Sequence, residues 1–154
     1  MPQRLSDVPM VDLVPETQAW NDGKGIDLEA WIGCEGRLEY AIAYGELFWP
    51  DFTEHDGCVF FSGFSEDSYR GFMKQTGGNR QAVEAVMNHS HIIDLFPGSR
   101  PAREQVLYFG RLLREMWATK LSRDFPDRKF VVSFPEEPSE DLLDYEVTFY
   151  QKRE

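Results

Sequence analysis

The sequence has few cysteines, few histidines and no long apolar run. Its two cysteines, Cys34 and Cys58, are too few for a secreted disulfide scaffold and form no Cys-x-x-Cys pair, so we predict two reduced thiols. No stretch approaches the roughly 20 apolar residues that cross a bilayer, and the first residues lack the apolar core of a secretory signal. We therefore expect a cytoplasmic protein that does not engage membranes.

Recognisable catalytic motifs are also missing. The chain has neither a Gly-x-Ser-x-Gly nucleophile elbow nor a Gly-x-x-x-x-Gly-Lys phosphate loop. Residues 22–31 partly match a calcium-binding EF-hand loop, but Ala19 and Ala30 stand where the leading aspartate and the bidentate glutamate are needed. We interpret that segment as a turn that leads into a short apolar stretch. These absences favour a protein that needs no cofactor and is not an enzyme.

Acidic side chains are in clear excess. Among 154 residues, 27 Asp and Glu face 16 Lys and Arg, giving a formal net charge of −11. This balance repels nucleic acid and attracts basic partners. Hydrophobic residues make up 42% of the chain, which is too apolar for a disordered acidic protein, so we predict a single globular domain over residues 1–154. The charge is uneven, because residues 100–129 carry eight basic and four acidic side chains.

The hydrophobic patterns predict an α+β fold, in which helices pack on a small antiparallel sheet. A long helix is expected near residues 101–123, where apolar residues recur every three or four positions. Two β-rich segments, 129–134 and 145–150, predict a C-terminal hairpin, and at least one more strand is expected. The further predicted elements are helices at 37–47, 66–75 and 80–88, a strand at 58–61 and a short edge strand at 8–14.

Two segments are candidates for binding a partner. The first is the polar connection between the C-terminal strands, which is long enough to extend outward; its acidic residues are Glu136, Glu137, Glu140, Asp141 and Asp144. The second is the aromatic loop at 48–52, which carries Trp49 and Phe52, because aromatic side chains dominate binding hot spots. Each segment also has a structural explanation: charge runs are usually solvated or paired internally, and aromatic side chains usually enter the core.

The histidines offer one possible metal site. His89 and His91 lie two residues apart, with Asp94 three residues further on. In an extended chain the two histidines would point the same way and the aspartate the other way. A transition-metal site needs three or four ligands, and two histidines alone are a weak match. We therefore predict no bound metal, with a small metal-dependent enzyme using His89, His91 and Asp94 as the alternative.

Composition and motifs together favour a binding function. We expect a non-enzymatic cytoplasmic protein that engages a basic protein partner through acidic and aromatic groups. In size, acidity and compartment the chain is similar to bacterial immunity proteins that neutralise toxins, which is a similarity of composition and not of motif. Besides the metal-dependent enzyme, a further alternative is a subunit of a larger assembly, with an apolar face that only a partner covers.

Overall fold

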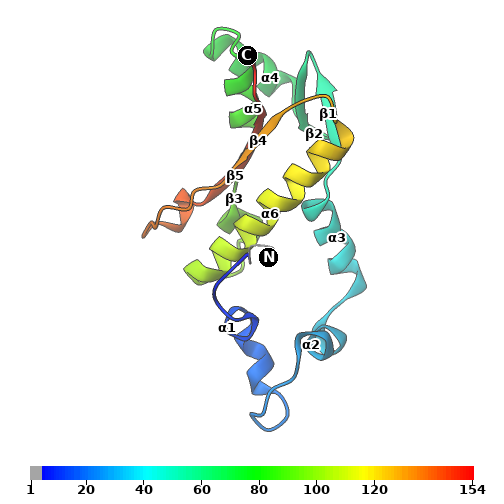
Figure 1. The fold of residues 1–154 in the computed structure, drawn as a ribbon, viewed down its shortest axis with the longest axis vertical. Coiled ribbons are helices and arrows are strands. Elements are labelled where there is room, and N and C mark those ends of the chain that lie inside the picture. The colour runs from blue at the N-terminus through cyan, green and yellow to red at the C-terminus, as the bar shows by residue number, and fades with distance from the viewer. Residues whose placement is uncertain (1–4) are drawn as a thin grey trace.

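The computed structural model describes residues 5–154 and has the predicted α+β fold (Figure 1). The helices are α1 Met10–Leu13, α2 Leu28–Glu35, α3 Leu38–Phe48, α4 Glu66–Gln75, α5 Arg80–Met87 and α6 Arg103–Asp124. The strands are β1 Phe52–His55, β2 Cys58–Phe61, β3 Ser90–His91, β4 Phe130–Ser133 and β5 Glu146–Gln151. Short 3₁₀ turns lie at Pro15–Ala19, Ile92–Leu95 and Leu142–Asp144.

Helix α6 is the central packing element, and its buried face follows the predicted spacing. Its fully buried apolar residues are Val106, Leu113, Trp117 and Leu121. Gly110 belongs to the same face, where a Cβ atom would lie 2.2 Å from the ring of Phe134. Only glycine therefore allows the aromatic ring of the segment after β4 to lie directly on the α6 backbone.

The strands form two antiparallel sheets. Strands β1 and β2 make a hairpin, whereas β5 lies in the centre of a second sheet in the order β3-β5-β4. The predicted C-terminal hairpin is thus present, with Val132 opposite Phe149. On the core side of β5, Val147 and Phe149 are completely buried. Strand β3 adds the third strand and places His91 opposite Glu146.

Helix α5 joins the two sheets through a buried carboxylate. Glu84 is completely buried, and its side chain accepts hydrogen bonds from the backbone N–H of Val59 on β2 (2.8 Å) and of Gln151 on β5 (2.9 Å). One turn later, the Asn88 side-chain amide donates to the carbonyl of Val59 (2.9 Å). These contacts satisfy backbone groups that would otherwise be buried without partners.

One sequence prediction near the N-terminus is wrong, and the structure adds detail to another. The edge strand expected at residues 8–14 is instead a single helical turn, α1, followed by a 3₁₀ turn that begins at Pro15. Proline fixes φ near −65°, which suits a helical turn, and no strand among residues 5–154 pairs with this segment. The turn expected within residues 22–31 is present at residues 21–24, and the short apolar stretch that follows it is helix α2, whose N-cap Asp27 accepts a hydrogen bond from the Ala30 N–H (2.7 Å).

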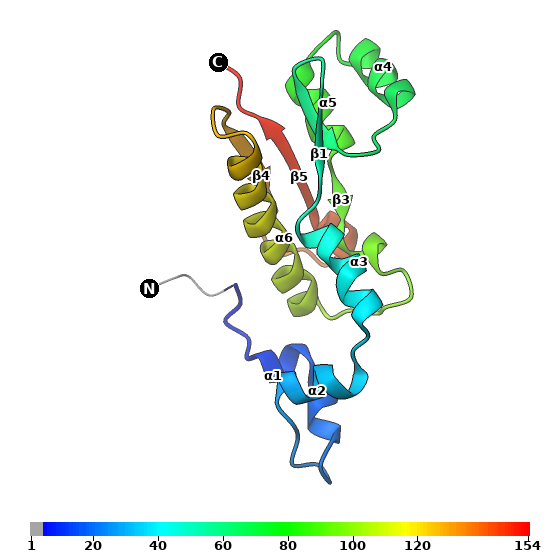
Figure 2. The same cartoon turned by 90° about the vertical axis from the view of Figure 1, so that its right-hand side faces the viewer.

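The molecule is elongated. Helices α1 and α2 form one end, and α4 and α5 with the β1–β2 hairpin form the opposite end, where the C-terminus also lies (Figures 1 and 2). Helix α6 and strand β5 run between the two ends. Within residues 5–154, no helix combines the length and the apolar character needed to cross a bilayer.

Candidate functional site

Helices α2 and α3 expose most of their apolar side chains. Neither helix contains a buried residue. The large apolar side chains exposed on them are Ile32 (56%), Leu38 (74%), Tyr40 (51%), Ile42 (64%) and Tyr44 (40%). We call these five residues together the α2–α3 face, although on α3 the helical spacing puts Leu38 and Ile42 on one side and Tyr40 and Tyr44 on the other. Only three other large apolar side chains within residues 5–154 are comparably exposed, so five of these eight side chains lie on α2 and α3.

Helix α3 is unusual because it is apolar on nearly all sides and still exposed. A helix that is hydrophobic all round is normally buried, and a helix of 11 residues gains most of its stability from packing. Its contacts with the body of the protein lie in its C-terminal half. Tyr44 packs on Phe96 with ring centroids 5.8 Å apart, and the Trp117 indole N–H donates to the carbonyl of Leu47 (2.9 Å). The rest of the helix has its apolar side chains in solvent.

The solvent-accessible surface of the protein is larger than expected for a compact monomer of its mass. The structure exposes 10,333 Å². For a mass of 17.9 kDa, a compact monomer is expected to expose about 8,000 Å². The excess of roughly 2,300 Å² is more than the area of about 800 Å² that each partner loses in a standard protein–protein interface. The chain is therefore less compact than a typical monomer of its mass.

Acidic side chains accompany the α2–α3 face. Between residues 27 and 48 the acidic residues are Asp27, Glu29, Glu35, Glu39 and Glu46. The one basic residue in this range is Arg37, which lies over the ring of Tyr40 and 3.8 Å from the carboxylate of Glu39. The apolar face is therefore accompanied by net negative charge.

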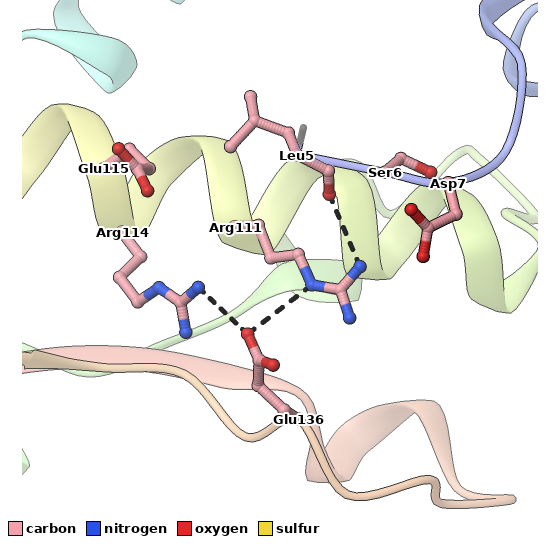
Figure 3. Close-up of a pocket in the computed structure, with 7 residues that line it drawn as sticks. All are labelled: Leu5, Ser6, Asp7, Arg111, Arg114, Glu115 and Glu136. Carbon is pink, nitrogen blue, oxygen red and sulfur yellow. Dashed lines mark hydrogen bonds and ion pairs between the residues drawn. The ribbon is translucent and has the colours of Figure 1, made fainter. Parts of the chain in front are cut away.

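The acidic loop after β4 is partly folded back onto α6 (Figure 3). Its Glu136 carboxylate lies 2.9 Å from the guanidinium of Arg114 and 3.6 Å from that of Arg111, which also donates to the carbonyl of Leu5 (3.4 Å). These residues line a polar pocket beside the N-terminal segment. The internal pairing between the basic helix and the acidic loop, one of the two explanations open from sequence, thus applies to Glu136.

The remaining candidate acids of that loop divide into two pairs. Asp141 accepts a hydrogen bond from the Leu143 N–H (2.9 Å), and Asp144 bonds to the hydroxyl of Ser139, so both help to shape the loop. All five candidate acids of the loop are exposed, Glu136 included. Glu137 and Glu140 differ from the other three in that neither takes part in an ion pair or a side-chain hydrogen bond within residues 5–154.

The two candidate aromatic residues lie close to the core. Phe52 packs against Phe61 and Phe149, with ring centroids 5.7 and 5.2 Å away. Trp49 is half-buried, and the Lys120 ammonium lies 5.9 Å from its ring centroid. Phe52 therefore contributes to the core, and Trp49 lies at its margin beside a positive charge.

The histidine cluster gains a different third member from the one expected. His89 and His91 lie edge to face, with ring centroids 5.2 Å apart. The Glu146 carboxylate on β5 lies 3.5 Å from His91 Nε2, and ligand atoms of the three residues lie within 4.8 Å of one another. Asp94, on the following 3₁₀ turn, is not part of this group. Sequence reasoning missed Glu146 because only strand pairing brings it there.

The two thiols occupy very different surroundings. Cys34 is exposed on α2, whereas Cys58 on β2 is completely buried. Burial, with a smaller contribution from the nearby charge of Glu84, raises the pKa of the Cys58 thiol to about 11. The thiolate is the reactive form, so Cys58 is protected both by its position and by its protonation.

We expect one fast and one slow thiol in the native protein. At neutral pH a thiol reagent should modify Cys34 rapidly and Cys58 only after unfolding, and Cys34→Ser should abolish the fast reaction. Counting modified thiols over time by mass spectrometry measures this. Two slow thiols would mean that α2 is covered, and two fast thiols would mean that β2 is accessible.

The molecule thus has two places of functional interest, the α2–α3 face at one end and the histidine cluster where β3 meets β5. No known protein-family model, curated protein or solved structure matches this chain. The evidence for function is therefore the geometry of these two places.

Proposed function

We propose that the protein is a non-enzymatic binding protein and that its α2–α3 face docks a protein partner. The partner presents an apolar patch rimmed by lysine and arginine. The observation that carries this proposal is helix α3, which is apolar nearly all round and contains no buried residue. A partner that covers it supplies the packing that the rest of the chain does not.

Burial of this face would contribute favourable free energy to association. Burying apolar surface contributes about 25 cal/mol per Å², so a patch of a few hundred Å² offsets several kcal/mol of the cost of association. Two of the five side chains are tyrosines, a residue type that is enriched in interface hot spots, and they lie on the other side of α3 from Leu38 and Ile42. The helix therefore exposes residue types that are found in binding surfaces.

The charge around the face selects the partner. The carboxylates near α2 and α3 favour a positively charged rim, because complementary potentials steer encounter and like charges oppose it. A second copy docked through the same face would bring the same carboxylates together across a two-fold axis. Nucleic acid and anionic lipid headgroups would meet the same repulsion. A basic protein is the occupant that fits.

A reducing compartment suits this proposal. Cys34 is an exposed thiol on α2, beside the proposed docking surface, and it stays a thiol where disulfides do not form. We therefore extend the proposal to a cytoplasmic protein. Neutralisation of a basic toxin, as by an immunity-type protein, is the specific form of this function that the composition favours.

The proposal is tested by removing the two most exposed aliphatic side chains of the face. The double variant Leu38→Ser/Ile42→Ser should bind its partner at least about 10-fold more weakly, because a hot-spot side chain contributes more than about 1.4 kcal/mol. Leu143→Ser is the control for loss of an exposed aliphatic side chain elsewhere, since Leu143 is also exposed (47%) but lies in the acidic loop, on the 3₁₀ turn Leu142–Asp144, and not on α2 or α3. Quantitative mass spectrometry of proteins co-purified from source cells identifies the partner, and titration measures the affinity.

Several outcomes would contradict the proposal. A partner retained equally by the double variant and the control would not use the α2–α3 face. If Glu137→Lys/Glu140→Lys abolished binding and the double variant did not, the acidic loop would be the binding site. Glu136 is left unchanged in that comparison, because its reversal would also break the ion pairs to α6. A partner without a basic surface would exclude the proposed charge complementarity.

A further inference from the structure

The histidine cluster has the arrangement of a metal site and plays no part in the proposed docking. Strand pairing places His91 directly opposite Glu146, and His89 precedes His91 by two residues on the same side of the sheet edge. His89 is exposed, and the side chains of His91 and Glu146 are 30% and 45% exposed, so an ion from solution has access. Three side chains with ligand atoms therefore converge on one accessible point.

The hydrogen bonds of the two histidines fix which ring nitrogen is available. His91 Nδ1 lies 2.7 Å from the carbonyl oxygen of Leu143, and His89 Nδ1 contacts the carbonyl oxygen of Val86. A carbonyl oxygen can only accept, so in both rings Nδ1 carries the hydrogen and donates it. In the neutral ring Nε2 then keeps its lone pair. Metal-binding histidines typically have this arrangement, with the second nitrogen donating to a carbonyl or carboxylate.

The contact between His91 and Glu146 favours a positive charge between the two side chains. With Nδ1 donating to Leu143, the neutral His91 ring presents a lone pair at Nε2 to the Glu146 carboxylate oxygen 3.5 Å away. Two acceptors that face each other are stabilised when a proton or a metal cation lies between them. The 3.5 Å separation is close to the edge of about 3.4 Å in a tetrahedron of ligands at 2.0–2.1 Å from a zinc ion.

We propose that His89 Nε2, His91 Nε2 and the Glu146 carboxylate bind one divalent transition-metal ion, with zinc as the expected occupant. Two imidazole nitrogens and one carboxylate oxygen are a ligand set for zinc or iron and not for calcium or magnesium. The ligand atoms lie within 4.8 Å of one another, so closing on an ion needs a small movement, for which the exposed His89 has room. Three protein ligands leave a fourth position for water.

This site differs from the one that sequence spacing offered. The alternative ligand set of His89, His91 and Asp94 takes its third ligand from nearby in the sequence, whereas the proposed set takes it from β5. A bound ion would link β3 to β5 where His91 of β3 pairs with Glu146 of β5. The site therefore also predicts that metal binding strengthens the pairing between these two strands.

The test is a titration of metal-free protein with zinc chloride. Wild-type protein should bind one Zn²⁺ per chain, and its melting temperature should rise when zinc is added. His89→Ala, His91→Ala and Glu146→Gln should each weaken binding about 10-fold or more. Cobalt(II) gives a second readout, because its visible absorption reports coordination by nitrogen and oxygen ligands.

Two matched controls make the outcome decisive. His55→Ala removes the remaining histidine of the chain, which lies on β1 away from the site, and should leave the affinity unchanged. Asp94→Asn should also leave it unchanged, and a loss there without a loss in Glu146→Gln would replace our ligand set with the one from sequence. Equal zinc binding by wild type and all site variants, or no binding, would overturn the proposal. His89→Ala keeps the test valid if His91→Ala does not fold, since His89 is exposed.

Discussion

Replacing Glu84 with alanine should destabilise the protein by about 3–5 kcal/mol, the range seen when one partner of a buried charged network is removed. The carboxylate is completely buried and accepts hydrogen bonds from the backbone of Val59 and of Gln151. It also accepts from the Gln151 side-chain amide and lies 3.5 Å from the guanidinium of Arg153. Without it, at least two buried backbone N–H groups lose their acceptor, each at a cost of about 1–3 kcal/mol.

Urea unfolding of wild type and variant measures this loss. Glu84→Gln should be less damaging than the alanine variant, because an amide oxygen can still accept from one of the two strands. Glu66→Ala is the surface control, since the Glu66 side chain is 64% exposed, and it should change stability by less than about 0.5 kcal/mol. A loss below about 1 kcal/mol for Glu84→Ala would mean that the link between the two sheets is replaced or unnecessary.

Replacing Leu113 with alanine should cost about 2–5 kcal/mol, because the substitution leaves a cavity in a well-packed core. Leu113 lies in the middle of α6, is completely buried and belongs to the core cluster that includes Trp117 and Phe149. The neighbouring core side chains can fill little of the cavity that the substitution leaves, because α6 is packed against β5 through Trp117, Val147 and Phe149.

The matched control for this substitution is Leu143→Ala, which removes the same atoms from a side chain that is 47% exposed. Its effect should stay within about 0.5 kcal/mol. The changes in unfolding free energy of both variants are obtained from their denaturant midpoints, provided that the dependence of the free energy on denaturant concentration is unchanged. If Leu113→Ala changed stability as little as the control, the apolar stripe of α6 would not be the centre of the core.

Much of the fold could be predicted because local signals and tertiary packing agree. The apolar spacing on α6 predicted a helix at 101–123, and the observed helix is Arg103–Asp124. Ser65 and Asn79 cap α4 and α5 as their residue types suggest, each accepting a hydrogen bond from a backbone N–H three residues later. At these places the sequence pattern and the packed structure favour the same conformation, so local reasoning succeeded.

The candidate sites were harder to predict because they depend on distant contacts. The apolar residues of α3 predicted a helix correctly, but no local pattern says whether its face is covered by the same chain. Glu146 joins His91 only through the register of β3 on β5, more than fifty residues apart in sequence. Glu136 turns back to Arg114 only because α6 passes beside the loop. Each of these contacts depends on how the chain is folded, and a short stretch of sequence does not reveal it.

The hydrogen bond from the Trp117 indole to the carbonyl of Leu47 has a thermodynamic consequence. It joins the centre of the core to the last turn of α3, the helix that we propose docks the partner. Anything that orders α3 in its bound position must then also favour the native placement of Trp117, and the coupling is reciprocal. A loosened core would lower the affinity for the partner, and an engaged partner would make the core harder to unfold, although no ligand touches Trp117 itself.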